Sequence, residues 1–383
     1  MRAGGSDITG TQSKPVSPAK LAALVFVPTL AIYWLCWRVQ PPDLEAYLYR
    51  WLDHIRAHGT LGAFAIPFSN YNPPYLYLLA GGAALTGSNL AVVKTLSILS
   101  VLCAAVALWR VARRFPGGIE AALLVPILPT ILANGIVYGQ CDGFWVAAVL
   151  MAIDADMDDS PFAMAAWAGL GFAFKAQAAF IAPYVIGRLL ARRASPAAWL
   201  LPAMIFAVAL APAWAAGWPF AHLSTIYLRQ ADYFNTISTA PGPWAIVALV
   251  VSPRPIAAFA FGYLAAALAA AAIIRAVARR RQIDFETMLA AALLSALLLP
   301  FLLPKMHERF LLLADLLSII LAVARPTRRW IAVTVMVQTA SALAILGAMS
   351  DLKLLPVLAT PLSLAAILAL VQVLARPPTR ERD

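Results

Sequence analysis

The segment Asp43-Leu-Glu-Ala-Tyr-Leu-Tyr-Arg-Trp-Leu-Asp-His-Ile-Arg-Ala-His58 follows the first apolar run of the chain, at about residues 20–38. The pair Pro41-Pro42 between them ends the preceding helix. Within the segment, leucines recur at helical spacing on the side opposite Tyr47 and Trp51. This pattern predicts a helix that lies in the membrane interface directly after a first membrane span.

The composition of the whole chain indicates a membrane protein. Of its 383 residues, 62% are hydrophobic and only 12% are charged, and apolar runs long enough to cross a bilayer recur along it. These features exclude an ordinary soluble globule and predict an all-α polytopic membrane protein. The net charge of +11 would indicate nucleic-acid binding in a soluble protein, but here arginines stand at the ends of apolar runs. The charge therefore orients the chain, and no nucleic-acid partner is predicted. Cys36, Cys103 and Cys141 show neither disulfide nor ligand spacing.

The apolar runs predict a single membrane domain, 1–383, with about twelve spans and both termini in the cytoplasm. The predicted spans lie near residues 20–38, 89–109, 118–137, 143–157, 163–177, 179–190, 197–216, 255–275, 285–303, 309–324, 330–349 and 356–375. The remaining regions are two cytoplasmic tails and the first outer loop, at 1–19, 376–383 and 39–88. The apolar segments 75–85 and 244–254 are predicted to be interfacial or re-entrant rather than crossing.

The arginine clusters agree with one orientation of these spans, because cytoplasmic ends of spans carry an excess of basic residues. The clusters lie at 110–114, 188–193, 275–281, 325–329 and 376–382. The outer face then receives Asp43, the Asn70-Tyr71-Asn72 turn, Gln140, Asp142, Lys175, the loop 217–243 and the run 305–309. A polar group in a membrane segment costs several kcal/mol unless it lines a cavity or has a partner. This set therefore predicts one outward-facing polar cavity.

Within that set, the run Lys305-Met-His-Glu-Arg309 carries more charge than a turn requires, because it places ionisable groups side by side between two long apolar runs. The other members have structural alternatives. Two roles are open for Asp43: N-cap of the helix that follows it, and catalytic residue. For Gln140 and Asp142, the structural alternative is capping of a helix start. For Lys175, it is a side chain that extends its charge to the membrane interface.

Other candidate ligand groups have weaker patterns. The run Asp154-Ala-Asp-Met-Asp-Asp159 lacks the glycine and terminal glutamate of a calcium loop and falls on the cytoplasmic side, so a solvated acidic turn is predicted. His54, His58 and His222 show no ligand spacing. Since no carboxylate pair or histidine cluster on the outer face has ligand spacing either, neither a metal nor another cofactor is predicted.

Several short motifs follow Asp43 and its tyrosine- and tryptophan-bearing helix in a fixed order. They are Asn70-Tyr-Asn-Pro-Pro-Tyr-Leu-Tyr-Leu78, Tyr138-Gly-Gln-Cys-Asp-Gly143, Phe174-Lys-Ala-Gln177 and Leu303-Pro-Lys-Met-His-Glu-Arg-Phe310. Together these residues, over about 20–325 of the chain, give a pattern that resembles the GT-C superfamily of integral-membrane glycosyltransferases. The resemblance is greatest to the bacterial relatives of the GPI-anchor mannosyltransferases.

This resemblance implies transfer of mannose, or of another hexose or a pentose, from a polyprenyl-phosphate donor to an acceptor hydroxyl on a glycan, lipid or protein. It implies a protein of the bacterial plasma (inner) membrane whose active site faces the periplasm or exterior. Asp43 corresponds to the catalytic base of such enzymes. Lys175, His307, Glu308 and Arg309 correspond to residues near the donor phosphate.

The residue types support the same chemistry directly. Transfer from a lipid phosphate needs one carboxylate to deprotonate the acceptor and cations to hold the departing charge. Asp43 is the predicted base for an inverting attack at the anomeric carbon. The predicted ligands of the donor phosphate are Lys175, Lys305, His307 and Arg309. The predicted substrate-binding residues are Tyr47, Trp51, Asn70, Tyr71, Asn72, Gln140, Asp142 and Glu308.

A transporter or flippase for lipid-linked or charged solutes is the alternative, because it too carries ionisable residues in its spans. Such a protein is expected to show internal repeats and matching broken helices, and the sequence shows neither. A lipid-linked polysaccharide polymerase or ligase is a third reading. It would carry a large outer loop rich in arginine, whereas the loop 217–243 has only Arg229.

Overall fold

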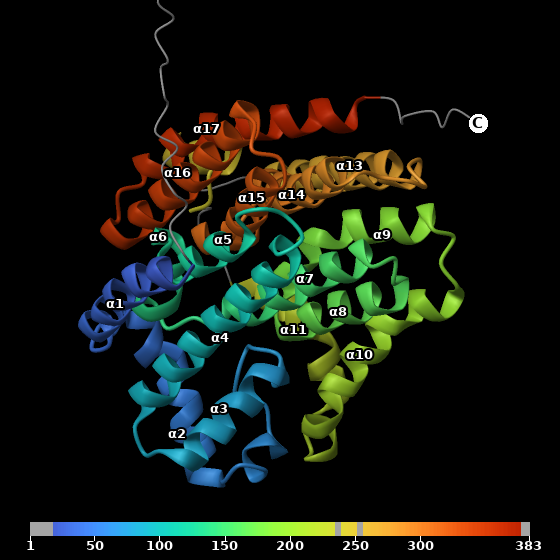
Figure 1. Ribbon diagram of the computed structural model, residues 1–383. Helices are drawn as coiled ribbons and strands as arrows, with labels where there is room; N and C mark the ends of the chain where they lie inside the picture. The colour runs from blue at the N-terminus through green and yellow to red at the C-terminus, as the bar shows by residue number, and fades with distance from the viewer. Residues whose placement is uncertain (1–17, 234–238, 251–255, 377–383) are drawn as a thin grey trace, which may run out of the picture.

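The computed structural model describes residues 18–233, 239–250 and 256–376, and every regular element within these ranges is helical. The all-α prediction is confirmed for this part of the chain. The predicted tails fall outside it over 1–17 and 377–383, as do parts of the loop 217–243 and of the segment 244–254. In Figure 1, α2 and α3 lie at the lower edge of the molecule, and α16 and α17 lie at the upper edge.

One set of α-helices lies along the predicted spans. They are α1 (Pro18–Cys36), α4 (Asn89–Ala112), α7 (Asp142–Met157), α8 (Pro161–Phe174), α9 (Ala182–Ala191), α10 (Pro196–Ala215), α13 (Ile256–Ala278), α14 (Phe285–Leu302), α15 (Leu312–Ala324), α16 (Arg328–Ser350) and α17 (Leu354–Leu374). The other α-helices are α2 (Tyr49–His58), α3 (Pro73–Leu85), α5 (Gly118–Leu124), α6 (Pro129–Leu132), α11 (Phe220–Tyr233) and α12 (Pro243–Val250). The π-helices are η1 (Leu44–Leu48) and η4 (Ala133–Val137), and the 3-10 helices are η2 (Gly62–Ala65), η3 (Val125–Ile127), η5 (Ala176–Ile181) and η6 (Glu308–Leu311).

Among the described residues, six helices are long and apolar enough to cross a membrane: α4, α10, Phe259–Ala278 of α13, α14, α16 and α17. The bent pair Gly118–Ile127 and Pro129–Val137, which meet at 44°, makes a seventh if it counts as one span. Helices at other predicted spans, such as α8, are shorter. These findings support an integral membrane protein, while the count of about twelve spans stays a prediction.

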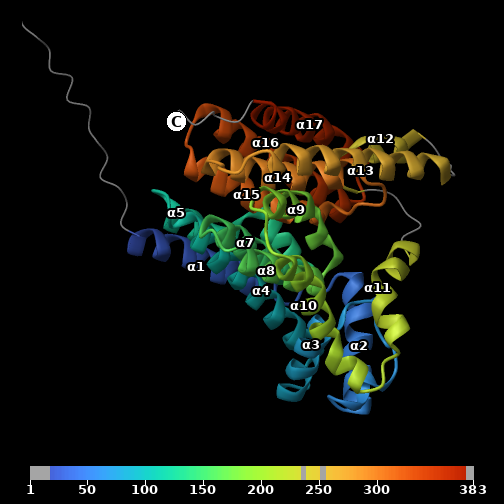
Figure 2. The same cartoon turned by 90° about the vertical axis from the view of Figure 1, so that its right-hand side faces the viewer.

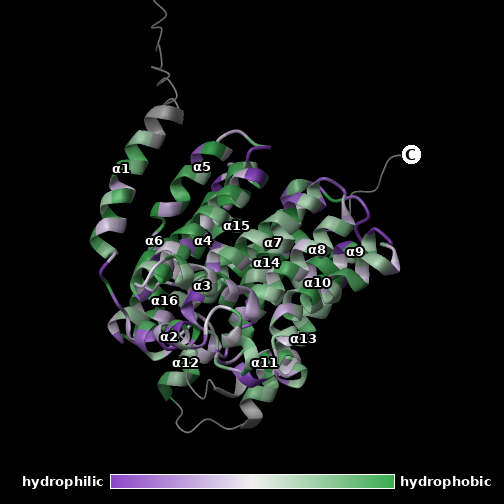
Figure 3. Cartoon of the chain, turned by 90° about the horizontal axis from the view of Figure 1, so that it is seen from below, coloured by the Kyte–Doolittle hydropathy of each residue, from purple (hydrophilic) through white to green (hydrophobic). Residues whose placement is uncertain are grey.

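The surface of the outer helices is apolar. Trp34 of α1 is 76% exposed and Phe261 of α13 is 72% exposed, and such side chains are suited to contact lipid rather than water. Figure 3 shows hydrophobic residues over most helices, with hydrophilic residues gathered on α2 and near the ends of α5 and α9. The polar surface of the protein is therefore concentrated in a few regions.

Close packing of α7 against α4 positions the start of α7, which carries Asp142. A Cβ atom at Gly143 would lie 2.1 Å from the carbonyl oxygen of Ser100 in α4, so only glycine permits this approach of the two backbones. Trp145, two residues further along α7, has no exposed surface. The N-terminal end of α7 is therefore fixed within the bundle.

Arginines of three of the predicted clusters, at 110–114, 188–193 and 275–281, meet on one face of the bundle, in line with their predicted common orientation. Arg188 of α9 donates a hydrogen bond to the carbonyl of Arg280 over 3.2 Å, and Arg280 donates to the carbonyl of Leu374 in α17 over 2.9 Å. Arg114, at the end of α4, pairs with Asp158 over 2.9 Å. The ends of α4, α7, α9, α13 and α17 thus lie together.

The prediction of a solvated acidic turn at 154–159 is wrong for Asp154 and Asp156, which are each 1% exposed. Arg114 Nη2 lies 2.6 Å from Asp154 Oδ1, and Arg188 Nε lies 2.9 Å from Asp156 Oδ2. The physical reason is that α7 continues through Met157, so both carboxylates sit on its last turn and face arginines of α4 and α9. These ion pairs hold the helix ends of the arginine-rich face together.

Candidate active site

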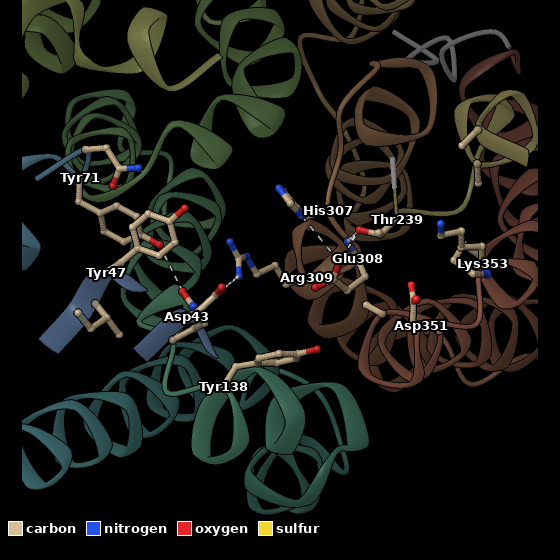
Figure 4. Close-up of a pocket in the computed structure, with 18 of the residues that line it drawn as sticks. Asp43, Tyr47, Tyr71, Tyr138, Thr239, His307, Glu308, Arg309, Asp351 and Lys353 are labelled. Atoms are coloured by element: carbon tan, nitrogen blue, oxygen red, sulfur yellow. Dashed lines mark hydrogen bonds and ion pairs between the residues drawn. The ribbon is translucent and has the colours of Figure 1, made fainter. Parts of the chain in front are cut away.

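A cavity of about 420 Å³ lies where segments far apart in the sequence meet. Its wall comes from η1 and α2, from the turns before α3 and after η4, from the turn before η6, and from α12, α16 and α17. Figure 4 shows charged and aromatic side chains converging on it. Its polar and aromatic lining residues are Asp43, Tyr47, Trp51, Asn70, Tyr71, Tyr138, Gln140, Thr239, His307, Glu308, Arg309, Asp351 and Lys353.

Asp43 and Arg309 form an ion pair in the middle of this wall. Arg309 Nη1 lies 3.6 Å from Asp43 Oδ2, and the side chains are 14% and 46% exposed. Asp43 occupies the N-cap position of η1, as the structural alternative predicts, but its side chain makes no capping hydrogen bond there. The predicted approach of an acid from the first outer loop and a base from the run 305–309 is confirmed.

The turn that carries Arg309 is held by Thr239. The Thr239 hydroxyl donates to the Glu308 carboxylate, and the Glu308 backbone N–H donates to Thr239 Oγ1 over 3.2 Å. Burial, followed by the nearby charge of Arg309, lowers the pKa of His307 to about 4. His307 is therefore a neutral hydrogen-bonding group at pH 7, and Arg309 carries the positive charge of this turn.

Lys175 lies behind the cavity wall rather than on it. Its Nζ is 2.8 Å from Asp142 Oδ1, and the same Asp142 oxygen accepts a hydrogen bond from Trp145 Nε1 over 2.8 Å. Lys175 is 6% exposed and Asp142 is fully buried, so the interfacial alternative for Lys175 is wrong. Asp142 belongs to the first turn of α7, whose N-cap is Cys141. The lysine lines a small pocket of about 30 Å³ that it shares with Arg309.

Lys305 is also absent from the lining of the 420 Å³ cavity. Its backbone has a φ of +62°, in the left-handed region, and its Nζ lies 5.5 Å from the ring centroid of Phe259 in α13. Of the predicted phosphate ligands, the cavity wall therefore holds His307 and Arg309, whereas Lys175 and Lys305 lie elsewhere.

Three neighbouring aromatic rings form one side of the cavity. The ring centroids of Tyr47 and Trp51 are 6.3 Å apart, and those of Trp51 and Tyr71 are 5.0 Å apart. The Tyr71 hydroxyl donates to Gln140 Oε1 over 3.3 Å. Tyr47 is 40% exposed and Trp51 is 5% exposed. Tyr47 therefore presents its ring to a ligand, while Trp51, Tyr71 and Gln140 brace it.

Asn70 and Asn72 have different positions. Asn70 lines the cavity, and its backbone carbonyl accepts a hydrogen bond from Gln230 of α11. Asn72 is 1% exposed, and its Nδ2 donates to the carbonyl of Ala173 over 3.0 Å and to the hydroxyl of Tyr227 over 2.9 Å. Asn72 thus ties the turn before α3 to α8 and α11 from behind the cavity.

Sequence reasoning missed Tyr138, Thr239, Asp351 and Lys353, which all line the cavity. Tyr138 opens a motif that was singled out for its order in the chain, and burial raises its pKa to about 12, which keeps its hydroxyl protonated. Asp351 and Lys353 stand between the last two predicted spans, on the outer side, so the same charge count that identified Arg309 could have found them. Thr239 gives no such signal in the sequence.

One known family matches part of the chain. Residues 71–216 match the family model described as dolichyl-phosphate-mannose-protein mannosyltransferase. The match supports the predicted resemblance to GT-C superfamily glycosyltransferases. A comparison with curated proteins gives no match. Asp43 and Arg309 lie outside the matched residues, so their roles depend on the geometry of the cavity.

The family match and the apolar helices together support a membrane glycosyltransferase in general.

Proposed function

We propose that the protein transfers a sugar from a polyprenyl-phosphate donor to an acceptor hydroxyl, with inversion, at the extracytoplasmic face of the bacterial inner membrane. The observation that carries the proposal is the Asp43–Arg309 pair in a 420 Å³ cavity, because it places a half-exposed carboxylate and a cation side by side in a space large enough for a substrate. The cavity lies on the opposite side of the predicted spans from the arginine-rich ends, which favours the outer face.

The reaction divides between these two residues. Asp43 accepts the proton of the acceptor hydroxyl, and the acceptor oxygen forms a bond to the anomeric carbon of the sugar. The bond between that carbon and the phosphate oxygen breaks, and its electron pair stays on the polyprenyl phosphate. Arg309 pairs with the phosphate through its planar guanidinium, which suits two phosphate oxygens at once. Binding of the phosphate to Arg309 releases Asp43 to act as the base.

The other cavity residues orient the sugar. Tyr47 offers an exposed ring for the apolar face of a pyranose, and neutral His307 offers a hydrogen bond to a phosphate oxygen or a sugar hydroxyl. Gln140, fixed by Tyr71, is placed to bond a hydroxyl group. The predicted roles of Lys175 and Asp142 become structural in this proposal, since the two side chains satisfy each other.

The test is transfer by Asp43→Asn membranes supplied with labelled polyprenyl-phosphate sugars. Loss of a positioned general base reduces the rate by roughly 100-fold or more. Glu45→Gln is the matched control, because Glu45 is exposed two residues further on and does not line the cavity. Wild-type transfer by Asp43→Asn would remove Asp43 as the base. Substrate transport by purified protein in liposomes, without any sugar transferred, would favour the transporter reading instead.

A further inference from the structure

A second cavity, of about 460 Å³, adjoins the first on the side of α11. The two cavities share Tyr47, Trp51 and Asn70 as lining residues, so they meet along one wall. Figure 2 shows α11 next to α2, the helix that begins just after Tyr47. We call this second cavity, lined by Tyr47, Trp51, Pro67, Phe68, Ser69, Asn70, His222, Ile226 and Arg229, the α11 groove.

We propose that the α11 groove binds the acceptor, and that the acceptor is a saccharide. The inference rests on the proposed transferase function, and it adds the substrate class for the half of the reaction that the first cavity leaves open. The first cavity holds the base and the phosphate-binding arginine. An acceptor that reaches Asp43 must therefore enter beside them, and the groove that shares the Tyr47 wall provides that entry.

The lining chemistry of the groove fits sugar rings. Tyr47, 40% exposed, supplies an aromatic face for the C–H face of a pyranose, and the partly buried Phe68, which is stacked on His54 with ring centroids 4.6 Å apart, lines the groove as well. Ser69 and Asn70 supply hydrogen-bonding groups beside those rings, and Arg229 supplies an exposed guanidinium. A site with rings on one side and donors around them matches a molecule that is apolar on its faces and hydroxylated at its edges.

The same lining does not suit a lipid tail. The only aliphatic residues of the groove are Pro67 and Ile226, and Ile226 is 1% exposed. A prenyl or acyl chain needs a continuous aliphatic surface to bury its methylene groups. The opposite end of the first cavity, by contrast, has Ala245, Ala248 and Ala348 in its wall. The aromatic and charged groove is thus the part of the site that favours a polar substrate.

The groove is also held in a fixed shape, as a binding site requires. Gln230 of α11 donates a hydrogen bond to the carbonyl of Asn70, which joins the two sides of the groove. Arg229 Nε donates to Thr225 Oγ1 over 3.1 Å, one turn back on the same helix. The Phe68 and Trp218 ring centroids lie 5.6 Å apart, so Phe68 is supported from behind. The guanidinium and the ring are therefore placed before an acceptor arrives.

The test measures saccharide binding without any donor. Full-length protein in nanodiscs is screened by saturation-transfer NMR against a panel of three- to six-residue oligosaccharides with hexose, pentose and uronic-acid backbones. We expect binding of at least one member, weakened about tenfold by Arg229→Ala, the size of effect expected when one charged hydrogen bond is lost. Arg50→Ala is the charge-matched control, because Arg50 is exposed on α2 and does not line the groove. A second variant, His222→Ala, tests the same rim independently of Arg229.

The outcomes separate this inference from the transferase proposal. If no panel member binds, or if both groove variants bind as the wild type does, the saccharide groove is refuted even when transfer depends on Asp43. If a saccharide binds and the groove variants weaken it, the groove is supported even when Asp43→Asn retains transfer. Binding that Arg50→Ala weakens as strongly as Arg229→Ala would show a nonspecific charge effect and would also refute the groove.

Discussion

Lys175 Nζ lies 2.8 Å from Asp142 Oδ1, and both side chains are buried. The pair lies behind the wall of the cavity that holds Asp43 and Arg309. Lys175 also lies 4.9 Å from the ring centroid of Tyr71, which lines that cavity. The pair therefore supports the aromatic side of the site from behind. Its charge is compensated by Asp142 and is not directed at the cavity.

Replacing Lys175 with methionine should therefore destabilise the protein. It would leave Asp142 as a buried, unpaired carboxylate, and breaking a buried pair in this way costs about 3–5 kcal/mol. The double variant Lys175→Met/Asp142→Asn should recover most of that loss, because the amide can still accept from Trp145. Thermal unfolding in detergent measures both. A Lys175→Met protein with the wild-type Tm but no transfer would instead place Lys175 on the donor phosphate.

The sequence was sufficient to predict that an acid near the start of the chain and a base near residue 307 meet in one cavity. Asp43 and the run 305–309 could be assigned to one cavity because the positive-inside rule places both loops on the same side of the membrane. The same rule could not separate Arg309 from Lys305 or Lys175. Which of several basic side chains reaches a cavity depends on local backbone geometry, such as the positive φ of Lys305, and on buried partners such as Asp142.

The acidic run at the end of α7 offers a comparison within one turn. The Asp156 carboxylate accepts a hydrogen bond from Arg188, forms an ion pair with Arg192 and is 1% exposed, whereas the Asp159 side chain is 89% exposed. Asp156→Ala should cost about 3–5 kcal/mol, because Arg188 would remain buried without its partner. Asp159→Ala, the same change on the solvent side, should stay within about 1 kcal/mol of the wild type. Equal Tm losses for the two variants would contradict the structure at this face.

The prediction of a solvated turn failed there for a reason the sequence does not contain. Charge density in a short run indicates exposure only when no opposite charge packs against it. The arginines that bury Asp154 and Asp156 come from α4 and α9, and the sequence does not say that the ends of these helices meet α7. The local composition indicates that the run is acidic. Whether its side chains are buried depends on contacts with other helices.

His307 should make the protein sensitive to acid. Its pKa falls from an ordinary value of 6.5 to about 4 in the folded state, chiefly through burial and then through Arg309. The unfolded chain then binds a proton on this histidine that the folded chain does not. Stability is therefore unaffected above about pH 6.5 and decreases as the pH falls towards 4, by up to about 3 kcal/mol.

The measurement is the difference in Tm between pH 7 and pH 4.5 for the wild type and for His307→Gln. The glutamine keeps a hydrogen-bonding side chain but cannot titrate, so the difference should shrink in the variant. His222→Gln serves as a comparison, because His222 lies on α11 away from the 420 Å³ cavity and its pKa is also lowered by burial, so the two variants show how much of the acid sensitivity belongs to His307. An unchanged difference in His307→Gln would assign the acid sensitivity to other groups.

Lys94 should position the cavity wall without touching a substrate. It is fully buried in α4, and its Nζ donates to the carbonyls of Ile136 and Val137, the latter over 3.1 Å. These carbonyls end η4 directly before Tyr138, which lines the cavity. Lys94→Met keeps the length of the side chain and removes both hydrogen bonds, so the free energy of unfolding should fall by roughly 1–3 kcal/mol.

The turn after η4 should then lose its fixed position, and small displacements of positioning groups cost up to about 100-fold in rate. We expect kcat for transfer to fall by at least about tenfold while the donor KM changes little, because Arg309 is untouched. Lys94→Arg retains donors towards both carbonyls and should restore part of kcat. A Lys94→Met enzyme with reduced Tm but wild-type kcat would show that the lysine only stabilises the bundle, since the effect on kcat is what distinguishes positioning from packing.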